Sequence, residues 1–343
     1  MLLFLTGPGG SGKSQVINMV LLYAKCFCEK LKFPFTKRTI VVTALTGVAA
    51  TQINGETTDK ACHLQGTKIT PAHIEEWKEA RLLIIDEISF ASKKGLSKLD
   101  STLRKLKQCL HDKYGSMNVV FTGDFSQLEP VKGEPLYYDM SFAKWHHWIN
   151  CFYELEGQHR FKDDPWYGAI MKRFREGRPT AADFEVINSH LVDSFGGNVS
   201  ADEMPSNIAY ATHENKERAA INASIFAKHV RATMSSDSTI PVPKHTLVIR
   251  STDMSWVIKN KSVPFNAKAR ELTWNQCSDA DVRGGRGFTR CVDPLLKLYN
   301  NIPLMVTDNI DVPRKKANGT TCWLDAIVLR EGITEDDMGL DLH

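Results

Sequence analysis

The sequence predicts an α/β fold, in which a parallel sheet carries helices on both of its faces. Through residues 1–155, short runs of leucine and β-branched residues alternate with stretches whose apolar residues have helical spacing. Apolar and polar residues do not alternate cleanly within the short runs, which is typical of strands buried on both faces. The first run, Leu2–Thr6, leads into a glycine-rich loop and then a helical pattern.

The first domain is expected to span residues 1–155, with a small insertion at about residues 55–78. Each predicted strand is an apolar run bounded by glycine or polar residues, and the five strands are Leu2–Thr6, Thr39–Ala44, Leu82–Asp86, Val119–Gly123 and Cys151–Leu155. Two helices are predicted from apolar residues that recur every three or four positions, at Lys13–Leu31 and Ser97–Leu110.

The pattern changes after Leu155, which indicates a second module. Residues 156–230 are expected to begin a second, incomplete α/β domain, and residues 231–343 to form part of it with a small β insertion. The elements expected there are helices at Trp166–Glu176 and Thr180–Leu191, a strand at Asn207–Thr212, a helix from near Glu214, and short strands at Pro303–Val306 and Thr321–Leu329. The Arg-Gly-Gly-Arg-Gly tract at residues 283–287 resembles an RNA-binding tract, although a single copy is more often a loop.

Composition excludes several classes of protein. Of the 343 residues, 42% are hydrophobic and 24% charged, as in globular domains rather than disordered or collagen-like chains. A net charge of +3 neither demands nor excludes a nucleic acid partner. No apolar run reaches the ~18 residues of a membrane span, and Met1–Leu5 is too short for a signal peptide. We therefore expect no membrane partner and no secretion. Eight cysteines without a C-x-x-C pair favour a cytosolic, nuclear or organellar interior.

A phosphate-binding motif follows the first strand. Residues 7–14, Gly-Pro-Gly-Gly-Ser-Gly-Lys-Ser, fit the P-loop pattern G-x-x-x-x-G-K-S between a strand and a helix. Lys13 is expected to hold the β- and γ-phosphates of a nucleotide, and Ser14 to bind Mg²⁺. A glycine turn with an incidental Lys-Ser is the alternative, which the strand–loop–helix context disfavours. The backbone N–H groups expected to face the phosphates belong to Gly7, Gly9, Gly10, Ser11 and Gly12.

Two carboxylates end the third predicted strand. Asp86 would reach the same sheet edge as the P-loop and hold Mg²⁺, and Glu87 could act as the general base toward water that attacks the γ-phosphate. A solvated strand end is the alternative reading of an Asp-Glu pair. Together with the P-loop, the pair predicts hydrolysis of a nucleoside triphosphate. A P-loop kinase remains conceivable, but kinases do not need the glutamate beside the aspartate.

A third transition from strand to loop places the amide of Gln127 where it could sense the γ-phosphate. At this point a family resemblance becomes specific. Residues 43–50 (TALTGVAA), 84–89 (IIDEIS) and 123–128 (GDFSQL) resemble the Pif-type DNA helicases of superfamily one, 5′→3′ branch, which include Helitron helicases. The resemblance is strong over residues 1 to about 215 and extends weakly to about 325.

The resemblance implies an enzyme, an ATP-dependent 5′→3′ DNA helicase with RecA-like domains that uses ATP and Mg²⁺. Its partners would be single-stranded DNA and tailed duplex DNA. The protein would act as a monomer in the nucleus or mitochondrion of a eukaryote, or otherwise in the cytoplasm. Family roles in DNA repair, recombination and telomere maintenance are not distinguished by the sequence.

The resemblance also implies roles for individual residues. The catalytic set is Lys13, Glu87, Gln127 and Arg160, in which Gln127 couples the γ-phosphate to DNA and Arg160 reaches the γ-phosphate from the second motor domain. For Arg160, a surface ion pair is the alternative. The residues expected to contact DNA are Thr43, Thr46 and Gly47 in the first domain and Thr212 and Asn215 in the second.

The sequence departs from the family pattern at several places. Asp59 puts an acid where the family usually has histidine, and Glu129 replaces a proline. Residues 303–320 resemble the start of the family's SH3-like insertion, but the chain ends at His343 without the last family motifs. We therefore expect unwinding to be impaired. The alternative is a remnant that binds nucleotide and DNA but does not unwind.

Overall fold

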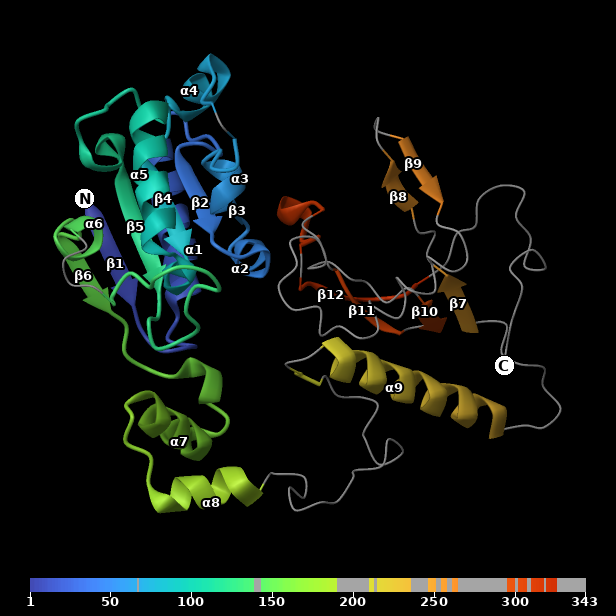
Figure 1. Cartoon of the computed structure of the whole chain (residues 1–343). Helices are drawn as coiled ribbons and strands as arrows, with labels where there is room; N and C mark the ends of the chain where they lie inside the picture. The colour runs from blue at the N-terminus through green and yellow to red at the C-terminus, as the bar shows by residue number, and fades with distance from the viewer. Residues whose placement is uncertain are drawn as a thin grey trace. The chain divides into compact units, whose positions relative to one another are not determined.

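The structure, a computed structural model, describes the larger part of the chain in two compact units (Figure 1). The first unit comprises Met1–Asn188 and Met305–Thr320, and the second comprises Ser189–Leu304 and Thr321–His343. The described residues are 1–66, 68–138, 143–189, 210–212, 215–235, 246–250, 254–257, 261–264, 295–299, 302–306, 310–317 and 319–325. No helix within these ranges is both long and apolar enough to cross a membrane.

The first unit is built on a six-stranded parallel sheet with the strand order β3-β2-β4-β5-β1-β6. Its strands are β1 (Leu2–Thr6), β2 (Ile40–Ala44), β3 (Glu56–Thr57), β4 (Leu82–Asp86), β5 (Asn118–Gly123) and β6 (Cys151–Glu154). The five predicted strands are confirmed to within one residue at each end. The two-residue strand β3 was not predicted, because so short a segment has no periodicity to detect. Strand β5 lies between β1 and β4, and so separates the strand before the P-loop from the strand that ends in Asp86.

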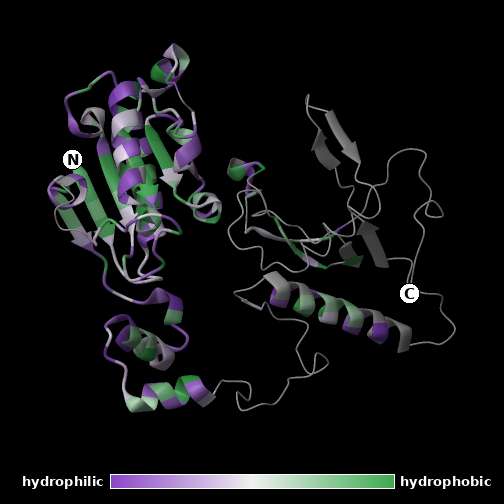
Figure 2. Cartoon of the chain, in the orientation of Figure 1, coloured by the Kyte–Doolittle hydropathy of each residue, from purple (hydrophilic) through white to green (hydrophobic). Residues whose placement is uncertain are grey.

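Helices cover both faces of this sheet, as predicted. Successive strand residues point to opposite faces, so Leu83 and Ile85 pack with Leu103 of α5 (Lys93–Leu106), whereas Ile84 packs with Ile17 of α1 (Lys13–Lys30). Figure 2 shows the strands between these helices as mostly hydrophobic. The result is one hydrophobic cluster on each face of a sheet buried on both sides.

Helix α5 begins four residues before its predicted start and ends four before its predicted end. It begins at Lys93 because the hydroxyl of Ser92 accepts a hydrogen bond from the N–H of Gly95, at 3.1 Å. It ends at Leu106, and Gln108 then adopts a left-handed conformation. The remaining short helices of the first unit are α2 (Gly47–Gln52), α3 (Thr58–Ala61), α4 (Pro71–Trp77), α6 (Ala143–His146), η1 (Ile88–Phe90), η2 (Lys113–Ser116), η3 (His159–Phe161) and η4 (Val312–Arg314).

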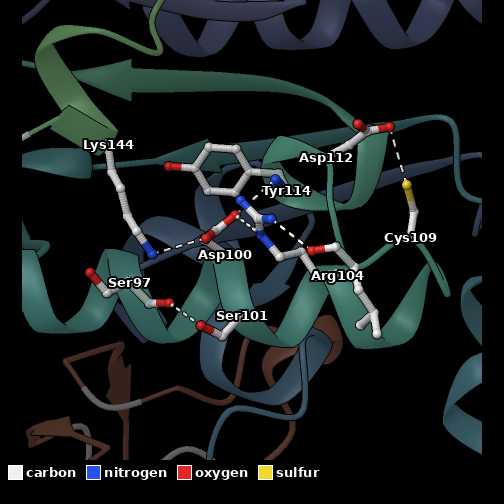
Figure 3. A network of polar contacts seen from close by, with 9 residues as sticks. Ser97, Asp100, Ser101, Arg104, Cys109, Asp112, Tyr114 and Lys144 are labelled. Atoms are coloured by element: carbon white, nitrogen blue, oxygen red, sulfur yellow. Dashed lines mark hydrogen bonds and ion pairs between the residues drawn. The ribbon is translucent and has the colours of Figure 1, made fainter.

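The buried carboxylate of Asp100 on α5 joins this helix to η2 and α6, the two short helices that precede β5 and β6 (Figure 3). Asp100 is 2% exposed. Its Oδ1 accepts hydrogen bonds from Nε of Arg104, at 3.0 Å, and from the N–H of Tyr114, at 2.9 Å. Its Oδ2 accepts from Nζ of Lys144, at 2.9 Å. Burial alone would raise the pKa of Asp100, but these three hydrogen bonds outweigh it and lower the pKa.

Two further helices follow β6 within the first unit, α7 (Pro165–Arg175) and α8 (Ala181–Ser189). They confirm the helices predicted in this region. Arg173 and Asp183 form an ion pair between them, in which both nitrogens of the guanidinium fork reach the carboxylate. Residues 156–188 thus cluster with the first sheet, and the predicted division into two motor domains at residue 155 stays a prediction.

The second unit contains one long helix and short antiparallel strand pairs. The helix predicted from near Glu214 is α9 (Asn215–Ser235). The strands are β7 (Thr246–Arg250) paired with β10 (Leu295–Tyr299), β8 (Met254–Val257) paired with β9 (Lys261–Pro264), and β11 (Pro303–Met305) paired with β12 (Thr321–Trp323). Of the strand predicted at Asn207–Thr212, residues 210–212 have no regular secondary structure and the rest lies outside the described residues. The tract at residues 283–287 also lies outside them.

Candidate nucleotide-binding site

The predicted P-loop connects β1 to α1 in the described structure. Gly10 and Gly12 have φ angles of +85° and +97°, which side chains other than glycine rarely adopt. These turns let the loop fold back over its own lysine. Nζ of Lys13 donates hydrogen bonds to the carbonyl oxygens of Gly7, at 2.7 Å, and Pro8, at 3.1 Å. The ammonium group is therefore held inside the loop, where the motif requires it.

Arg160 lies against the P-loop, as expected of a residue that reaches the γ-phosphate. The N–H of His159 donates a hydrogen bond to the carbonyl of Gly10, at 3.0 Å. A Cβ atom placed on Gly10 would lie only 2.5 Å from Cβ of Arg160, and one placed on Gly9 would lie 3.4 Å from its Nη1. Glycine is therefore needed at position 10 for the segment after β6 to pack this closely.

Asp86 and Glu87 occupy the carboxyl end of β4. Asp86 is 5% exposed, and its Oδ1 accepts hydrogen bonds from the hydroxyl of Thr122 on β5 and from the N–H of Glu87, at 2.9 Å. Glu87 has a left-handed backbone with φ of +58°. Gly123 makes room for this turn, because a Cβ atom there would lie 2.9 Å from the backbone nitrogen of Ile88.

The electrostatics of this edge suit acid–base chemistry. Burial, and then the neighbouring Asp86, raise the pKa of Glu87, although Lys13 and Arg160 oppose the shift. Oε2 of Glu87 is buried and has no hydrogen-bond partner among the described residues. Burial also lowers the pKa of Lys13, against the attraction of three nearby carboxylates. A carboxylate with a raised pKa and a free buried oxygen is a suitable general base.

The oxygen donors at this edge fit a magnesium ion. Ser14 offers a hydroxyl in the first turn of α1, and both partners of Asp86 bond Oδ1, which leaves Oδ2 for a cation shell. The described ranges contain no group of three or more His, Cys, Asp or Glu residues that could hold a metal ion. Mg²⁺ usually takes one or two protein oxygens and completes its shell with water and phosphate oxygens, so the hydroxyl of Ser14 and Oδ2 of Asp86 would be enough to hold it.

Gln127 lies next to the P-loop and is held by a neighbouring aspartate. Its Nε2 donates a hydrogen bond to Oδ2 of Asp124, at 3.3 Å, and lies 3.5 Å from the position of a Cβ atom on Gly9. Asp124 is 2% exposed and forms an ion pair with Nη1 of Arg175 from α7. Burial would raise the pKa of Asp124, but the bonds from Arg175 and from the N–H of Ser126 lower it.

Sequence reasoning missed Asp124 and Arg175 as members of this site. Asp124 could have been found, because it directly follows Gly123, the last residue of a predicted strand. Asp86 likewise lies at the carboxyl end of a predicted strand. Nothing in the sequence distinguishes Arg175 from Arg173 or Arg178. Only the fold brings α7 to the carboxyl end of β5.

An open apolar cavity of about 790 Å³ adjoins the P-loop. It is lined by Ser11 and Gly12 of the loop, by apolar residues along α1 such as Val16 and Met19, and by His159. Its position beside the phosphate loop and its apolar walls suit the base of a nucleotide.

The residues predicted to contact DNA in the first domain differ in their exposure. Thr43 is fully buried; its hydroxyl donates to the carbonyl of Ile84, at 2.9 Å, and accepts from the hydroxyl of Thr58, at 3.1 Å. A direct phosphate contact needs a side chain that reaches solvent, and that of Thr43 does not. Thr46 caps α2 by accepting a hydrogen bond from the N–H of Ala49, at 3.2 Å. Both Thr46 and Gly47 are partly exposed.

A groove of about 450 Å³ lies beside Thr46. Two exposed, oppositely charged residues line it, Asp59 and Lys132. The other residues predicted to contact DNA belong to the second unit: Thr212 is exposed, and Asn215 is the first residue of α9. Contacts between either of them and DNA stay predictions.

Comparisons with known proteins find similarity to DNA helicases. Residues 1–163 match the family model described as PIF1-like helicase. The chain is 26% identical over 234 residues to ATP-dependent DNA helicase PIF1 of Saccharomyces cerevisiae, which is 63% of this chain and 25% of that protein. It is 32% identical over 139 residues to ATP-dependent DNA helicase RRM3 of the same organism, which is 37% of this chain and 18% of that protein. The chain thus spans a quarter or less of the length of these curated relatives.

Solved structures share the fold. The match with the crystal structure of Pif1 helicase from Candida albicans covers 97% of this chain and 67% of the Candida chain, with a TM-score of 0.59 and 22% identity. The match with the structure of Pif1 helicase from Bacteroides in complex with ADP-AlF3 and single-stranded DNA covers 95% of this chain and 66% of the Bacteroides chain, with a TM-score of 0.56 and 17% identity. At this identity, the likeness shows the fold of the chain, an α/β architecture of the RecA-like type.

Proposed function

Because the chain belongs through residues 1–163 to the PIF1-like helicase family, we propose that it provides the ATP-hydrolysing motor of a DNA helicase. The observation that carries this proposal is the convergence of four functional groups on one sheet edge. The ammonium of Lys13, the carboxylate of Glu87, the amide of Gln127 and the guanidinium of Arg160 all lie around the P-loop.

In this mechanism, backbone N–H groups of the P-loop and the ammonium of Lys13 bind the β- and γ-phosphates. Ser14 and Asp86 would hold Mg²⁺, which when bound supplies positive charge to the phosphate oxygens. Glu87 accepts a proton from water as it attacks the γ-phosphate, and its raised pKa favours this acceptance. Arg160 stabilises the charge that develops on the transferred phosphoryl group.

Single-stranded DNA is the proposed partner, with translocation in the 5′→3′ direction. The relatives support this partner: structures of Bacteroides Pif1 are described as bound to single-stranded DNA, and one Pif1 structure concerns unwinding of forked duplex DNA. In this chain, the support is the groove beside Thr46, at the carboxyl edge of β2. Contacts there would use hydroxyl and backbone groups with phosphates and would carry no sequence preference.

ATPase turnover, measured with and without single-stranded DNA, tests the proposal. We expect Mg²⁺-dependent turnover that rises with single-stranded DNA and is lost in Lys13→Ala, because that variant lacks the charge that neutralises the β- and γ-phosphates. Strand displacement from a duplex with a 5′ tail, compared with a 3′ tail, tests the direction. Hydrolysis unchanged in Lys13→Ala would contradict the assignment. Turnover stimulated by DNA without displacement would favour a protein that binds nucleotide and DNA but does not unwind.

A further inference from the structure

The carboxylate of Asp124 is a shared acceptor between the P-loop edge and α7. A single oxygen, Oδ2, accepts from Nε2 of Gln127, at 3.3 Å, and is paired with Nη1 of Arg175. The other oxygen, Oδ1, accepts from the N–H of Ser126, at 3.0 Å. Arg175 lies 51 residues after Asp124 in the chain, so this contact joins two distant segments of the first unit.

From this geometry we infer that Arg175 is a positioning residue, which acts through Asp124 to orient the amide of Gln127 toward the nucleotide. The inference rests on the proposed function, because it concerns how the γ-phosphate is sensed. Gln127 is the group that would touch the phosphate. Arg175 and Asp124 would not touch it.

The chemistry of the three groups explains the orientation. An ionised carboxylate only accepts hydrogen bonds, so it selects the NH₂ end of the glutamine amide and not its carbonyl. One N–H of this NH₂ group is then used by Asp124, while the other remains available beside Gly9 of the P-loop. A phosphate oxygen is also an acceptor, so the orientation that Asp124 selects is the one a γ-phosphate requires.

Arg175 supplies the positive charge that keeps the buried carboxylate of Asp124 ionised, and an ionised carboxylate can only accept hydrogen bonds. A carboxylate that is 2% exposed is costly to ionise without a paired charge. Arg175 pairs with it through a charge-assisted hydrogen bond, and the arginine side chain is itself only 25% exposed. Lys13 also attracts this carboxylate electrostatically, but Arg175 is the cation bonded to it. Without Arg175, Oδ2 would lose that bond, and the amide of Gln127 would lose its fixed direction.

Arg173 offers a matched comparison within the same helix. It lies two residues before Arg175 and also pairs with an almost fully buried aspartate, Asp183 of α8. No contact of Arg173 or Asp183 with the P-loop is found in the described residues. Loss of Arg173 should therefore cost packing between α7 and α8 without affecting the nucleotide.

The test uses the full chain and equilibrium titration with two fluorescent nucleotides, a non-hydrolysable ATP analogue and ADP. In Arg175→Gln we expect affinity for the ATP analogue to fall about tenfold, as for loss of one charge-assisted hydrogen bond, while affinity for ADP changes less than about twofold. Arg175→Lys should recover part of the loss, because it restores the charge without the planar fork. Arg173→Gln should leave both affinities unchanged.

A double variant separates positioning from general structural damage. If Arg175 acts through the amide, Arg175→Gln added to Gln127→Ala should cost no further affinity for the ATP analogue. Equal losses for ADP and the ATP analogue, additive losses in the double variant, or the same losses in Arg173→Gln would overturn the inference. Failure of the unmodified chain to bind either nucleotide would instead contradict the proposed function. Thermal unfolding of each variant checks folding, and Asp124→Asn replaces Arg175→Gln if the latter does not fold.

Discussion

The hydroxyl of Thr122 on β5 donates a hydrogen bond to Oδ1 of Asp86 on the neighbouring strand β4. Thr122 is fully buried, so this hydroxyl has no access to water. The bond fixes the carboxylate that would hold Mg²⁺, with Oδ2 left for the cation. Groups that hydrogen-bond a metal ligand fix its orientation and thereby affect metal affinity.

Thr122→Val should therefore weaken Mg²⁺-dependent binding of an ATP analogue by about tenfold, because loss of such a partner typically costs 10–100-fold in metal affinity. Binding of ADP measured without Mg²⁺ should not change. Thr43→Val is the matched control, since Thr43 is equally buried but donates its hydroxyl to a carbonyl oxygen of the chain. A similar loss in both variants would indicate general damage to the sheet.

Glu87→Gln should retain binding of ATP and Mg²⁺ but lose most hydrolysis, because an amide cannot accept the proton of the attacking water. Loss of a general base typically costs about 10²–10⁴-fold in rate. Turnover with single-stranded DNA and titration of nucleotide binding measure the two effects separately. Unchanged turnover would show that Glu87 is not the base.

Charges in the groove beside Thr46 should act on DNA binding with opposite signs. Asp59→Asn removes a negative charge from this groove and should raise affinity for single-stranded DNA. Lys132→Ala should lower it and reduce the slope of log affinity against log salt by about 1, as expected for one lost phosphate contact. Fluorescence anisotropy with a labelled oligonucleotide at several salt concentrations measures both. If neither variant changed the affinity for single-stranded DNA, the DNA would not bind along this groove.

Asp100→Asn should destabilise the first unit without changing the nucleotide site. Hydrogen bonds to charged groups contribute about 1.5–3 kcal/mol each in net stability, so we expect a loss of about that size at pH 7. The pKa of Asp100 lies below its ordinary value of 3.8. Its stabilisation is therefore complete above about pH 4 and is lost as the pH falls through the lower pKa of the folded state.

Urea unfolding of the unmodified chain and of Asp100→Asn, at pH values from 7 to 3, tests this effect. The difference in free energy of unfolding should stay constant down to about pH 4 and shrink below it. A difference that grew on acidification would have the wrong sign for a carboxyl group with a lowered pKa.

The sequence by itself determined the first sheet and the groups at its phosphate edge. The strands of the sheet are continuous apolar runs because both of their faces are buried, and such runs can be recognised without a structure. The P-loop and Asp86-Glu87 could be placed together because parallel strands end at one edge of a sheet. Even Arg160, far along the chain, was predicted near the nucleotide from family resemblance.

Tertiary structure alone decided how the side chains at that edge are paired. The family resemblance predicts that Thr43 contacts DNA, but its hydroxyl donates to the carbonyl of Ile84 and accepts from the hydroxyl of Thr58 inside the first unit. Arg175 looked like any other arginine of an amphipathic helix until the packing of α7 brought it to Asp124. Such pairs join residues far apart in the chain, and their geometry depends on how helices pack on the sheet. Local sequence patterns therefore do not predict which of these side chains meet.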